Sequence, residues 1–369
     1  MNTMLAARLH SVAQPFQVDT VPVPTPGDDE VLVRVHACGV VPNLKNVAYH
    51  YPEWFPFLPL PKLPAIYGLD PAGEIVALGR HVEGLKIGDR VYVNPARSCG
   101  GCAKCRRGDT VSCAAFTFAG YFGFGPGSKK VLERHSSGGF AEYLVAPTTS
   151  LVVLPEQVTY EQAARFGYLG TAYAALRHAN AGSHSSVLIN GVTGTLGVGA
   201  TLLALAMGVP KILAVARNKE LLAAVKALAP DRIATYSTLD GPCTEWAKQQ
   251  TDGFGPDIMI EALGPGAPME ATLTAMHSVS RGGTIVTVGG MDTDIAINPI
   301  WIMVNQIRYQ GSAWFTTAQG EDMAMMAKAG TLDLSRLEHQ RFSLAQVNDA
   351  LDAAQHRNLG GFSNIVVTP

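Results

Sequence analysis

Two patterns of hydrophobic and polar positions divide the chain. Up to about residue 155, short runs of β-branched and other apolar residues are separated by clusters of proline and glycine, which is the pattern of strands and turns. Such runs cover Val31–His36, Gly73–Ala77 and Phe140–Val145. From about residue 186, apolar runs alternate with helical stretches. We therefore expect a β-rich domain over residues 1–155 and an α/β domain over residues 156–330.

The second pattern is a repeated strand–helix–strand succession. Strands are predicted over Val187–Asn190, Lys211–Ala216, Asp257–Glu261 and Thr284–Val288, and helices over Gly194–Gly208, Lys219–Leu228 and Ala267–Ser280. This succession is typical of a doubly wound α/β fold with a parallel sheet. The last segment, residues 331–369, contains a predicted helix over Leu344–Gln355 and a predicted strand over Ser363–Val367. We expect this segment to return to the first domain.

One segment fits neither pattern. Residues 49–64 read YHYPEWFPFLPLPKLP, and so many prolines exclude a regular helix or an interior strand. We expect a shaped loop at the surface or at the edge of a pocket. Aromatic residues of this loop and of a later stretch are candidates for lining an apolar pocket, with plain packing as the alternative: Trp54, Phe55, Phe57, Tyr121, Phe122 and Phe124.

Composition excludes several classes of protein. The 369 residues carry a net charge of −2, which gives no sign of binding to nucleic acid or to an anionic membrane. The longest apolar run, Leu196–Val209, is too short to span a bilayer, and the first residues lack a secretory signal pattern. Six cysteines, four of them in one motif, favour a reducing cytoplasm. Only 16% of the residues are charged, so we expect partner subunits to cover part of the surface.

The most specific chemical motif is a cysteine cluster. Cys99, Cys102, Cys105 and Cys113 lie in a short lobe over residues 95–115. Zinc prefers four thiolates at tetrahedral corners, and short Cys-x-x-Cys steps bring pairs of thiolates onto one ion. Because four protein ligands complete the coordination sphere, we expect a structural Zn²⁺ that is closed to substrate. The alternatives are a disulfide pair or four unrelated thiols.

A glycine-rich turn joins the predicted strand Val187–Asn190 to an apolar helix. Such a turn lets the backbone approach a pyrophosphate, and the helix N-terminus offers free N–H groups. The alternative is a tight turn that binds nothing. The residues of this turn that we expect at a dinucleotide are Gly191, Thr193, Gly194, Thr195, Leu196 and Gly197.

The second predicted strand indicates which dinucleotide is bound. NAD-binding proteins carry an acidic residue at the end of this strand to hold the ribose hydroxyls, whereas this chain has Ala216 there, followed by Arg217 and Lys219. A guanidinium suits a 2′-phosphate, which it binds with two hydrogen bonds. We therefore predict NADP(H), the alternative being that Arg217 is only a solvated charge.

Taken together, these motifs resemble the medium-chain dehydrogenase/reductase superfamily, in the branch typified by zinc alcohol dehydrogenases. The resemblance covers essentially the whole chain. Besides the cysteine lobe and the phosphate loop, it rests on motifs at Val33–Val40, Pro64–Val76, Gly138–Tyr143 and Thr171–Leu176. It implies a GroES-like N-terminal catalytic domain and a Rossmann cofactor domain.

The resemblance also shows where this chain departs from the branch. The branch holds a second, catalytic zinc, and the positions of its three ligands are occupied here by Val41, Leu69 and Gly167. None of these residues can ligate a metal. Cys38 belongs to a strand motif and does not stand at a ligand position. We therefore predict that the structural zinc is kept and the catalytic zinc is lost.

Losing that zinc changes the chemistry expected. Zinc polarises a carbonyl and lets an alcohol ionise, whereas hydride addition to a conjugated C=C needs only donors at a remote oxygen and a proton for the α carbon. Zinc-free relatives commonly reduce enones, enals or enoyl thioesters. The candidate catalytic residues are Tyr168, Asp70 and Asn43. The alternatives for the first two are a space-filling aromatic and a structural carboxylate.

Three functional hypotheses follow. The first is an NADP(H)-dependent reductase of an activated C=C, or C=N, in a small apolar substrate. The second is a zinc-independent oxidoreductase of alcohols, aldehydes or ketones. The third is a protein that binds NADPH without catalysis. Tyr67, Tyr49 and His50 are weaker site candidates.

The remaining expectations concern assembly and the end of the chain. The resemblance places an edge strand that pairs across a subunit boundary over Pro299–Trp314, so we expect a homodimer or homotetramer. Gly289, Gly360 and Gly361 are expected near the cofactor. The stretch His356–Ser363 departs from the family's usual ending, so its usual basic contact with the cofactor is not expected here.

Overall fold

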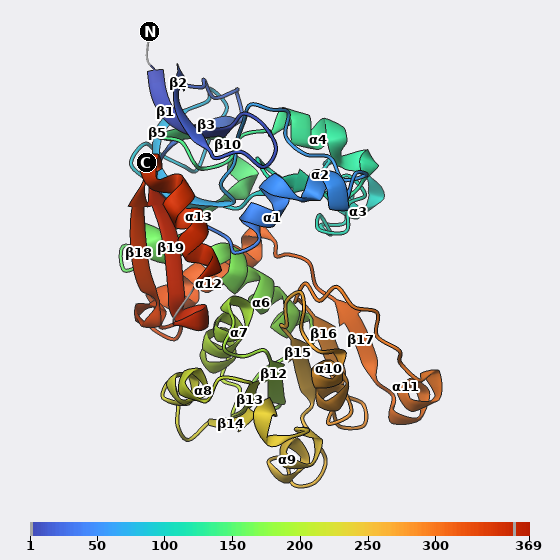
Figure 1. The fold of residues 1–369 in the computed structure, drawn as a ribbon. Helices are drawn as coiled ribbons and strands as arrows, with labels where there is room; N and C mark the ends of the chain where they lie inside the picture. The colour runs from blue at the N-terminus through green and yellow to red at the C-terminus, as the bar shows by residue number, and fades with distance from the viewer. Residues whose placement is uncertain (1–2, 357–358) are drawn as a thin grey trace.

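The computed structural model describes residues 3–356 and 359–369. The β-rich N-terminal elements lie at one end of the molecule and the α/β elements at the other (Figure 1). Residues 357 and 358, within the predicted stretch His356–Ser363, lie outside the described residues, as do residues 1 and 2. In the described part of the chain, no helix is long and apolar enough to cross a membrane.

The α/β part is built on a six-stranded parallel sheet. The strands lie at Ser186–Asn190 (β12), Lys211–Ala216 (β13), Ile233–Ser237 (β14), Ile258–Glu261 (β15), Thr284–Thr287 (β16) and Arg308–Gly311 (β17). Their order in space is β14-β13-β12-β15-β16-β17. Counted from β12, this is the order 3-2-1-4-5-6 of dinucleotide-binding folds. The predicted α/β fold class is therefore confirmed.

Burial explains why these segments form interior parallel strands. Residues 187–190, 212–216 and 258–261 are buried without interruption, as expected when helices cover both faces of a sheet. The helices of this part are Phe166–His178 (α6), Thr195–Ala206 (α7), Lys219–Lys226 (α8), Thr244–Gln249 (α9), Met269–Met276 (α10), Pro299–Asn305 (α11) and Thr317–Lys328 (α12). The side chain of Asn218 caps α8 by accepting a hydrogen bond from the backbone N–H of Leu221.

The N-terminal part is built mainly on antiparallel strands, and the two strands that the C-terminal segment adds to it pair in parallel. Its main sheet has the order β11-β6-β5-β3-β19-β18, and β10 also pairs with β3. The strands are Glu30–Gly39 (β3), Asp70–Leu78 (β5), Arg90–Val93 (β6), Tyr143–Pro147 (β10), Leu151–Val153 (β11), Glu338–Ser343 (β18) and Ser363–Thr368 (β19). In β19, Val366 pairs with Gly39 of β3, so the C-terminal segment lies against the N-terminal strands.

Smaller elements complete this part. One sheet joins Thr3–Leu9 (β1), Gln17–Pro22 (β2) and Ala65–Ile66 (β4), and another joins Ala96–Arg97 (β7), Thr117–Phe118 (β8) and Phe122–Gly123 (β9). The short helices are Leu44–Tyr49 (α1), Tyr51–Trp54 (α2), Ala103–Arg106 (α3), Lys129–Arg134 (α4) and Tyr160–Ala163 (α5), and Val347–Gln355 (α13) packs near the C-terminus.

Two local predictions are wrong in part. The proline-rich segment 49–64 contains the single-turn helix α2, because Pro52 stands in its first turn, where no backbone N–H is needed. The predicted edge strand over Pro299–Trp314 begins instead as the helix α11, whose N-terminus is capped by Asn298 and starts with Pro299. Only β17 is a strand, and it forms the edge of the sheet beside β16.

Candidate active site

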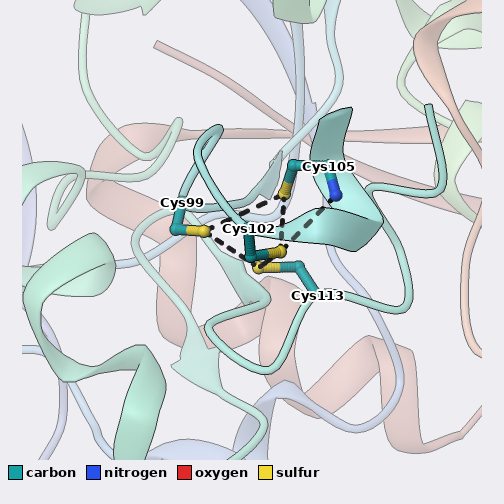
Figure 2. A group of neighbouring side chains, drawn as sticks. All are labelled: Cys99, Cys102, Cys105 and Cys113. Atoms are coloured by element: carbon teal, nitrogen blue, oxygen red, sulfur yellow. Dashed lines mark hydrogen bonds between the residues drawn. The ribbon is translucent and has the colours of Figure 1, made fainter. Parts of the chain in front are cut away.

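The four cysteines of the lobe converge on one point (Figure 2). Their sulfur atoms lie within 4.8 Å of one another. The Sγ atoms are separated by 3.6 Å between Cys99 and Cys113, 3.5 Å between Cys102 and Cys105, and 3.8 Å between Cys102 and Cys113. The backbone N–H of Cys105 donates to the Sγ of Cys102 at 3.5 Å, so α3 holds this pair at a fixed spacing.

These distances fit a tetrahedral zinc site. With Zn–S bonds of about 2.3 Å, the sulfurs of a Zn–S₄ tetrahedron lie about 3.8 Å apart. A disulfide would need sulfurs about 2.05 Å apart, and all six cysteines are free. The cluster can therefore hold a structural zinc ion. Among the described residues, no second group of three or more histidine, cysteine or acidic side chains converges in this way.

The phosphate loop follows β12 and begins α7. Gly191 has a φ of +80°, which favours glycine. A Cβ on Gly197 would lie 2.4 Å from the carbonyl oxygen of Gly191, so a side chain there would push the loop away from the helix. Gly194 is the N-cap of α7, with no side-chain cap. Free N–H groups therefore remain for a phosphate at the start of the helix.

The C-terminal segment packs directly on this loop. The N–H of Gly361 donates to the carbonyl oxygen of Thr193 at 2.8 Å. A Cβ on Gly361 would lie 2.1 Å from the carbonyl oxygen of Gly194, and one on Gly360 would lie 2.6 Å from that of Thr193. Both glycines thus contact the backbone of the phosphate loop, and their proximity to a bound cofactor stays a prediction.

Arg165 joins the C-terminal segment to the start of α7 through hydrogen bonds. It precedes α6 and is 6% exposed. Its Nη2 donates to the carbonyl oxygens of Gly361 at 2.7 Å and Thr195 at 3.4 Å, and its Nη1 donates to that of Ser363 at 3.3 Å. One side chain therefore ties α7, β19 and the start of α6 together. Sequence reasoning missed this residue, because its partners are remote in the sequence.

The two basic residues that follow β13 differ in their side-chain contacts. Arg217 is exposed, and the described residues offer its side chain no ion pair or hydrogen bond. Lys219 is held by Asp240, with 2.7 Å between Nζ and the carboxylate oxygen. Ala216 is buried at the strand end. Of the two predicted contacts, Arg217 is thus the one whose charge is available to a ligand.

A cleft of about 810 Å³ lies between the two parts of the chain. Its cofactor side includes the predicted residues Gly194, Thr195, Leu196 and Gly289. Gly191, Thr193, Gly197, Arg217 and Lys219 do not line it. The remaining walls are largely aromatic, and contributing side chains include Tyr51, Phe118, Tyr121, Phe122, Phe124, Tyr168 and Trp314. Trp54, Phe55 and Phe57, which the sequence also offered as pocket residues, lie elsewhere.

Two of the three residues that the resemblance places at metal-ligand positions are apolar and lie at this cleft. Val41 and Leu69 are 4% and 5% exposed and line the cleft. At the third position, a Cβ on Gly167 would lie 2.1 Å from Oδ1 of Asp70. The carboxyl of Asp70 therefore fills the space that a ligand side chain at this position would need. Cys38 is fully buried in β3 and does not line the cleft.

Asp70 is buried beneath the cleft. It is 1% exposed and does not line the cavity. The hydroxyl of Tyr92 donates to its Oδ1 at 2.7 Å. Burial raises the pKa of Asp70 to about 7, against the opposing effects of the Tyr92 hydrogen bond and the Arg165 charge. The geometry favours the structural alternative for this residue, since a ligand in the cleft does not meet it.

Tyr168 and Asn43 both line the cleft. Tyr168 lies in the first turn of α6, with the guanidinium of Arg165 5.5 Å from its ring centroid. The amide of Asn43 is engaged: its Nδ2 donates to the hydroxyl of Tyr51 at 2.9 Å, and its Oδ1 accepts from Asn46 at 3.1 Å. Asn43 therefore positions Tyr51, whose own hydroxyl hydrogen remains available to a ligand.

Tyr121 is a further polar group at the cleft. It is 3% exposed, and its hydroxyl has no hydrogen-bond partner among the described residues. Burial raises the pKa of Tyr121 well above its usual range, and the nearby phenols of Tyr168 and Tyr51 add to this shift. The phenol is therefore protonated at neutral pH and able to donate. The sequence suggested Tyr121 only as a pocket aromatic, because nothing local shows that its hydroxyl is unpartnered.

The weaker candidates lie outside the cleft. Tyr67, Tyr49 and His50 are absent from its lining. Burial raises the pKa of Tyr67 to about 12, and the ring of His50 stacks on Trp54 with 4.9 Å between centroids. These positions suit packing roles.

Comparison with known proteins agrees with this geometry. The chain matches the alcohol dehydrogenase GroES-like domain over residues 27–156 and the zinc-binding dehydrogenase family over residues 195–329. It is 31% identical over 359 residues to the uncharacterized zinc-type alcohol dehydrogenase-like protein YphC of Escherichia coli K12, with 95% of each chain covered. The chain belongs to the medium-chain dehydrogenase/reductase superfamily.

Other members extend the comparison. The chain is 30% identical over 361 residues to an alcohol dehydrogenase of Geobacillus stearothermophilus, covering 97% of this chain and 98% of that one. The crystal structure of AibC matches with a TM-score of 0.84 and 27% identity, over 100% of this chain and 96% of that chain. A zinc-binding dehydrogenase of Sinorhizobium meliloti, solved bound to NADP, shares the fold at a TM-score of 0.81 and 24% identity, with 100% of both chains covered. Family membership makes this chain an alcohol dehydrogenase-like oxidoreductase.

Proposed function

We propose that this chain is an NADP(H)-dependent reductase that adds hydride to an activated C=C, or C=N, of a small apolar substrate without a catalytic zinc. The observation that carries the proposal is the composition of the cleft. At the ligand positions of the branch stand two aliphatic side chains and a glycine, and phenols surround them. An aromatic cleft with a few hydroxyl donors suits an apolar molecule with one polar end.

The choice of a conjugated double bond follows from what these donors can stabilise. A plain carbonyl gains most from a Lewis acid at its oxygen, and the ligand positions here supply no donor atom for a metal. In a conjugated substrate the negative charge forms on a remote oxygen and is stabilised by ordinary hydrogen bonds. Tyr121 and Tyr51 have hydroxyls available for that role.

Bound NADPH would supply the hydride to the β carbon. The chain's own residues then have three tasks. Tyr121 donates to the oxygen on which charge develops, and Asn43 orients Tyr51 toward the same end of the substrate. Tyr168 stands in the cleft near the cofactor loop and delivers the proton to the α carbon. The C=C bond thus gains one hydride and one proton, and the tyrosinate is reprotonated from solvent.

Product analysis tests this proposal. The protein is incubated with NADPH and an α,β-unsaturated ketone, and the products are separated by gas chromatography. We expect the saturated ketone. The allylic alcohol would instead identify a zinc-independent carbonyl reductase. Absence of turnover over a broad panel of enones and carbonyls, with NADPH bound, would identify a non-catalytic NADPH-binding protein.

Variants of the phenols assign their tasks. Loss of one preorganised donor to a developing oxyanion lowers kcat by about 100-fold or more, so we expect losses of this order in Tyr121→Phe and in Tyr168→Phe. For Tyr168→Phe, solvent deuterium incorporation at the α carbon should also lose its stereochemical preference. The control is Tyr236→Phe, whose hydroxyl bonds to Pro242 outside the cleft. Equal activity in all variants would refute the assignment.

The preference for NADP(H) rests on Arg217. No carboxylate stands at the end of β13, and the described residues leave this guanidinium unpaired at the surface. We expect Arg217→Ala to weaken binding of NADPH by about tenfold or more, in line with the loss of a charge-assisted pair, and to leave NADH binding unchanged. The control is Lys226→Ala, an exposed residue of α8. An equal effect on both cofactors would refute the preference.

We further propose that the chain forms a homodimer through α11 and β17. Three apolar side chains of α11 are strongly exposed: Ile300 at 65%, Met303 at 69% and Val304 at 53%. They adjoin β17, the edge of the parallel sheet, and an unpaired edge is a natural site for pairing with a second copy. The four thiols required for zinc also support the cytoplasmic location that the cysteine content suggests.

A further inference from the structure

A second cavity lies in the N-terminal part of the molecule. Its volume is about 530 Å³, and none of its lining residues lines the candidate active site. The walls come from β1, β2, β4 and β10 and from the loop that follows α4. The proposed reaction uses none of these residues, so the cavity needs an explanation of its own.

Arg97 of β7 is the most unusual residue of this cavity. It is only 7% exposed. Its Nη1 donates to the carbonyl oxygens of Asn94 at 2.5 Å and Ala96 at 2.9 Å. Its Nε is buried without a hydrogen-bond partner, and among the described residues no carboxylate forms an ion pair with it. A buried guanidinium without an ion-pair partner destabilises the folded protein unless a ligand compensates its charge.

The other charged residues around Arg97 are mostly basic. Arg8, Lys62, Arg134 and His135 also line the cavity, and Glu30 is the one carboxylate in its lining. The charge of Arg8 is balanced by Asp19 at 3.1 Å. Lys62 and Arg134 form no ion pair with any described residue. Three cationic groups, Arg97, Lys62 and Arg134, therefore face one carboxylate in a concave site, which concentrates a positive potential.

The pKa of His135 agrees with this potential. Burial and then the neighbouring charges of Arg97 and Arg134 lower the pKa of His135 to about 4. His135 is thus neutral at pH 7, and an anion in the cavity would offset the part of this pKa shift that comes from the neighbouring cations, which is smaller than the part due to burial.

We propose that this cavity binds a small phosphate monoester, with Arg97 as the buried ligand of the phosphate group. The fork of an arginine matches two phosphate oxygens, and Lys62, Arg134 and the hydroxyls of Ser136 and Ser137 are further donors in the lining. A dianion balances these cations better than a monocarboxylate does. The cavity is larger than one phosphate, so an organic group fits beside it.

The position of Arg97 couples this site to the aromatic cleft. Arg97 pairs with Thr117 across the β7–β8 ladder, and Phe118, the next residue of β8, lines the cleft. The following residue, Ala119, lines the phosphate cavity. An occupant that fixes Arg97 therefore also fixes the strand that carries Phe118. We expect the ligand to change the KM for the apolar substrate and to leave the cofactor affinity unchanged.

Calorimetry on the full chain tests the proposal. The protein is first saturated with NADPH, so that the nucleotide site is occupied, and is then titrated with inorganic phosphate and, separately, with glycerol 3-phosphate. We expect one site per chain that binds glycerol 3-phosphate more tightly than inorganic phosphate. The variant Lys62→Gln/Arg134→Gln, altered only at the mouth of the cavity, should bind at least about tenfold more weakly. Lys328→Gln, an exposed change on α12, should bind as the wild type does.

Three results of these titrations would overturn the proposal in whole or in part. No binding of either compound at millimolar concentration would overturn the proposal, and so would binding that the double variant leaves unchanged. Equal affinity for both compounds would overturn the proposal that an organic group binds beside the phosphate group, and would leave a site for free phosphate. Arg97→Met gives a second check, since without the buried charge the protein should lose the thermal stabilisation that glycerol 3-phosphate gives to the wild type.

Discussion

Replacing Asp70 with asparagine has an effect on stability that can be worked out from the structure. Burial raises the pKa of this carboxyl to about 7 from the 3.8 of an exposed aspartate. Because the folded-state pKa is the higher one, the folded protein binds more protons than the unfolded chain between these values. The buried carboxyl therefore destabilises the folded protein least in acid, where it is protonated. The free energy of unfolding falls as the pH rises toward 7. One pKa unit corresponds to about 1.4 kcal/mol, so this group alone removes about 2 kcal/mol between pH 5.5 and pH 8.

Asparagine keeps an acceptor for the Tyr92 hydroxyl but does not ionise. Urea unfolding at pH 5.5 and pH 8, followed by tryptophan fluorescence at fixed zinc and protein concentration, measures the difference. Relative to wild type, the unfolding free energy of Asp70→Asn should rise by about 2 kcal/mol between these pH values. The exposed Asp231→Asn is the control. The same pH dependence in Asp70→Asn and wild type would refute the burial argument, and a large fall in kcat would show that Asp70 acts in the reaction.

Three other predictions concern the zinc lobe, the C-terminal segment and the assembly. Removing zinc with a chelator should expose the four lobe cysteines to a thiol reagent, and a count that does not change on chelation would contradict the zinc site. Gly361→Ala places a methyl 2.1 Å from the carbonyl oxygen of Gly194, so NADPH should bind about tenfold more weakly in a fluorescence titration. Gly125→Ala, with open space around its Cβ, should bind as wild type does. Met303→Asp should convert the dimer to a monomer in light scattering, whereas Phe254→Asp, at an exposed site elsewhere, should leave the mass unchanged.

Local patterns predicted the cofactor half of the molecule well. The phosphate loop can be predicted because the contacts that require its glycines are local in the sequence. Gly197 shows this, since a side chain there would collide with the backbone of Gly191. The cysteine lobe is readable for the same reason, since its spacing alone brings four sulfurs together. The strands β12, β13, β15 and β16 were predicted because buried parallel strands are continuously apolar.

Contacts between segments that are distant in the sequence could not be predicted from such local patterns. Asp70 looked like an acid left behind by a metal site, and only its bond to Tyr92 shows how it is held. Tyr121 looked like one aromatic among several, and its unpartnered hydroxyl is visible only in the folded chain. The helix α11 was missed because the resemblance to the family placed an edge strand over this segment, although Asn298 and Pro299 form a recognisable helix start.

Zinc per chain, measured by elemental analysis on active protein purified without added metal, tests the central claim most directly. We predict one zinc per chain, held by the cysteine lobe, in a protein that turns over an enone. Two zinc ions per chain would contradict the account, because the second would need ligands at the positions of Val41, Leu69 and Gly167.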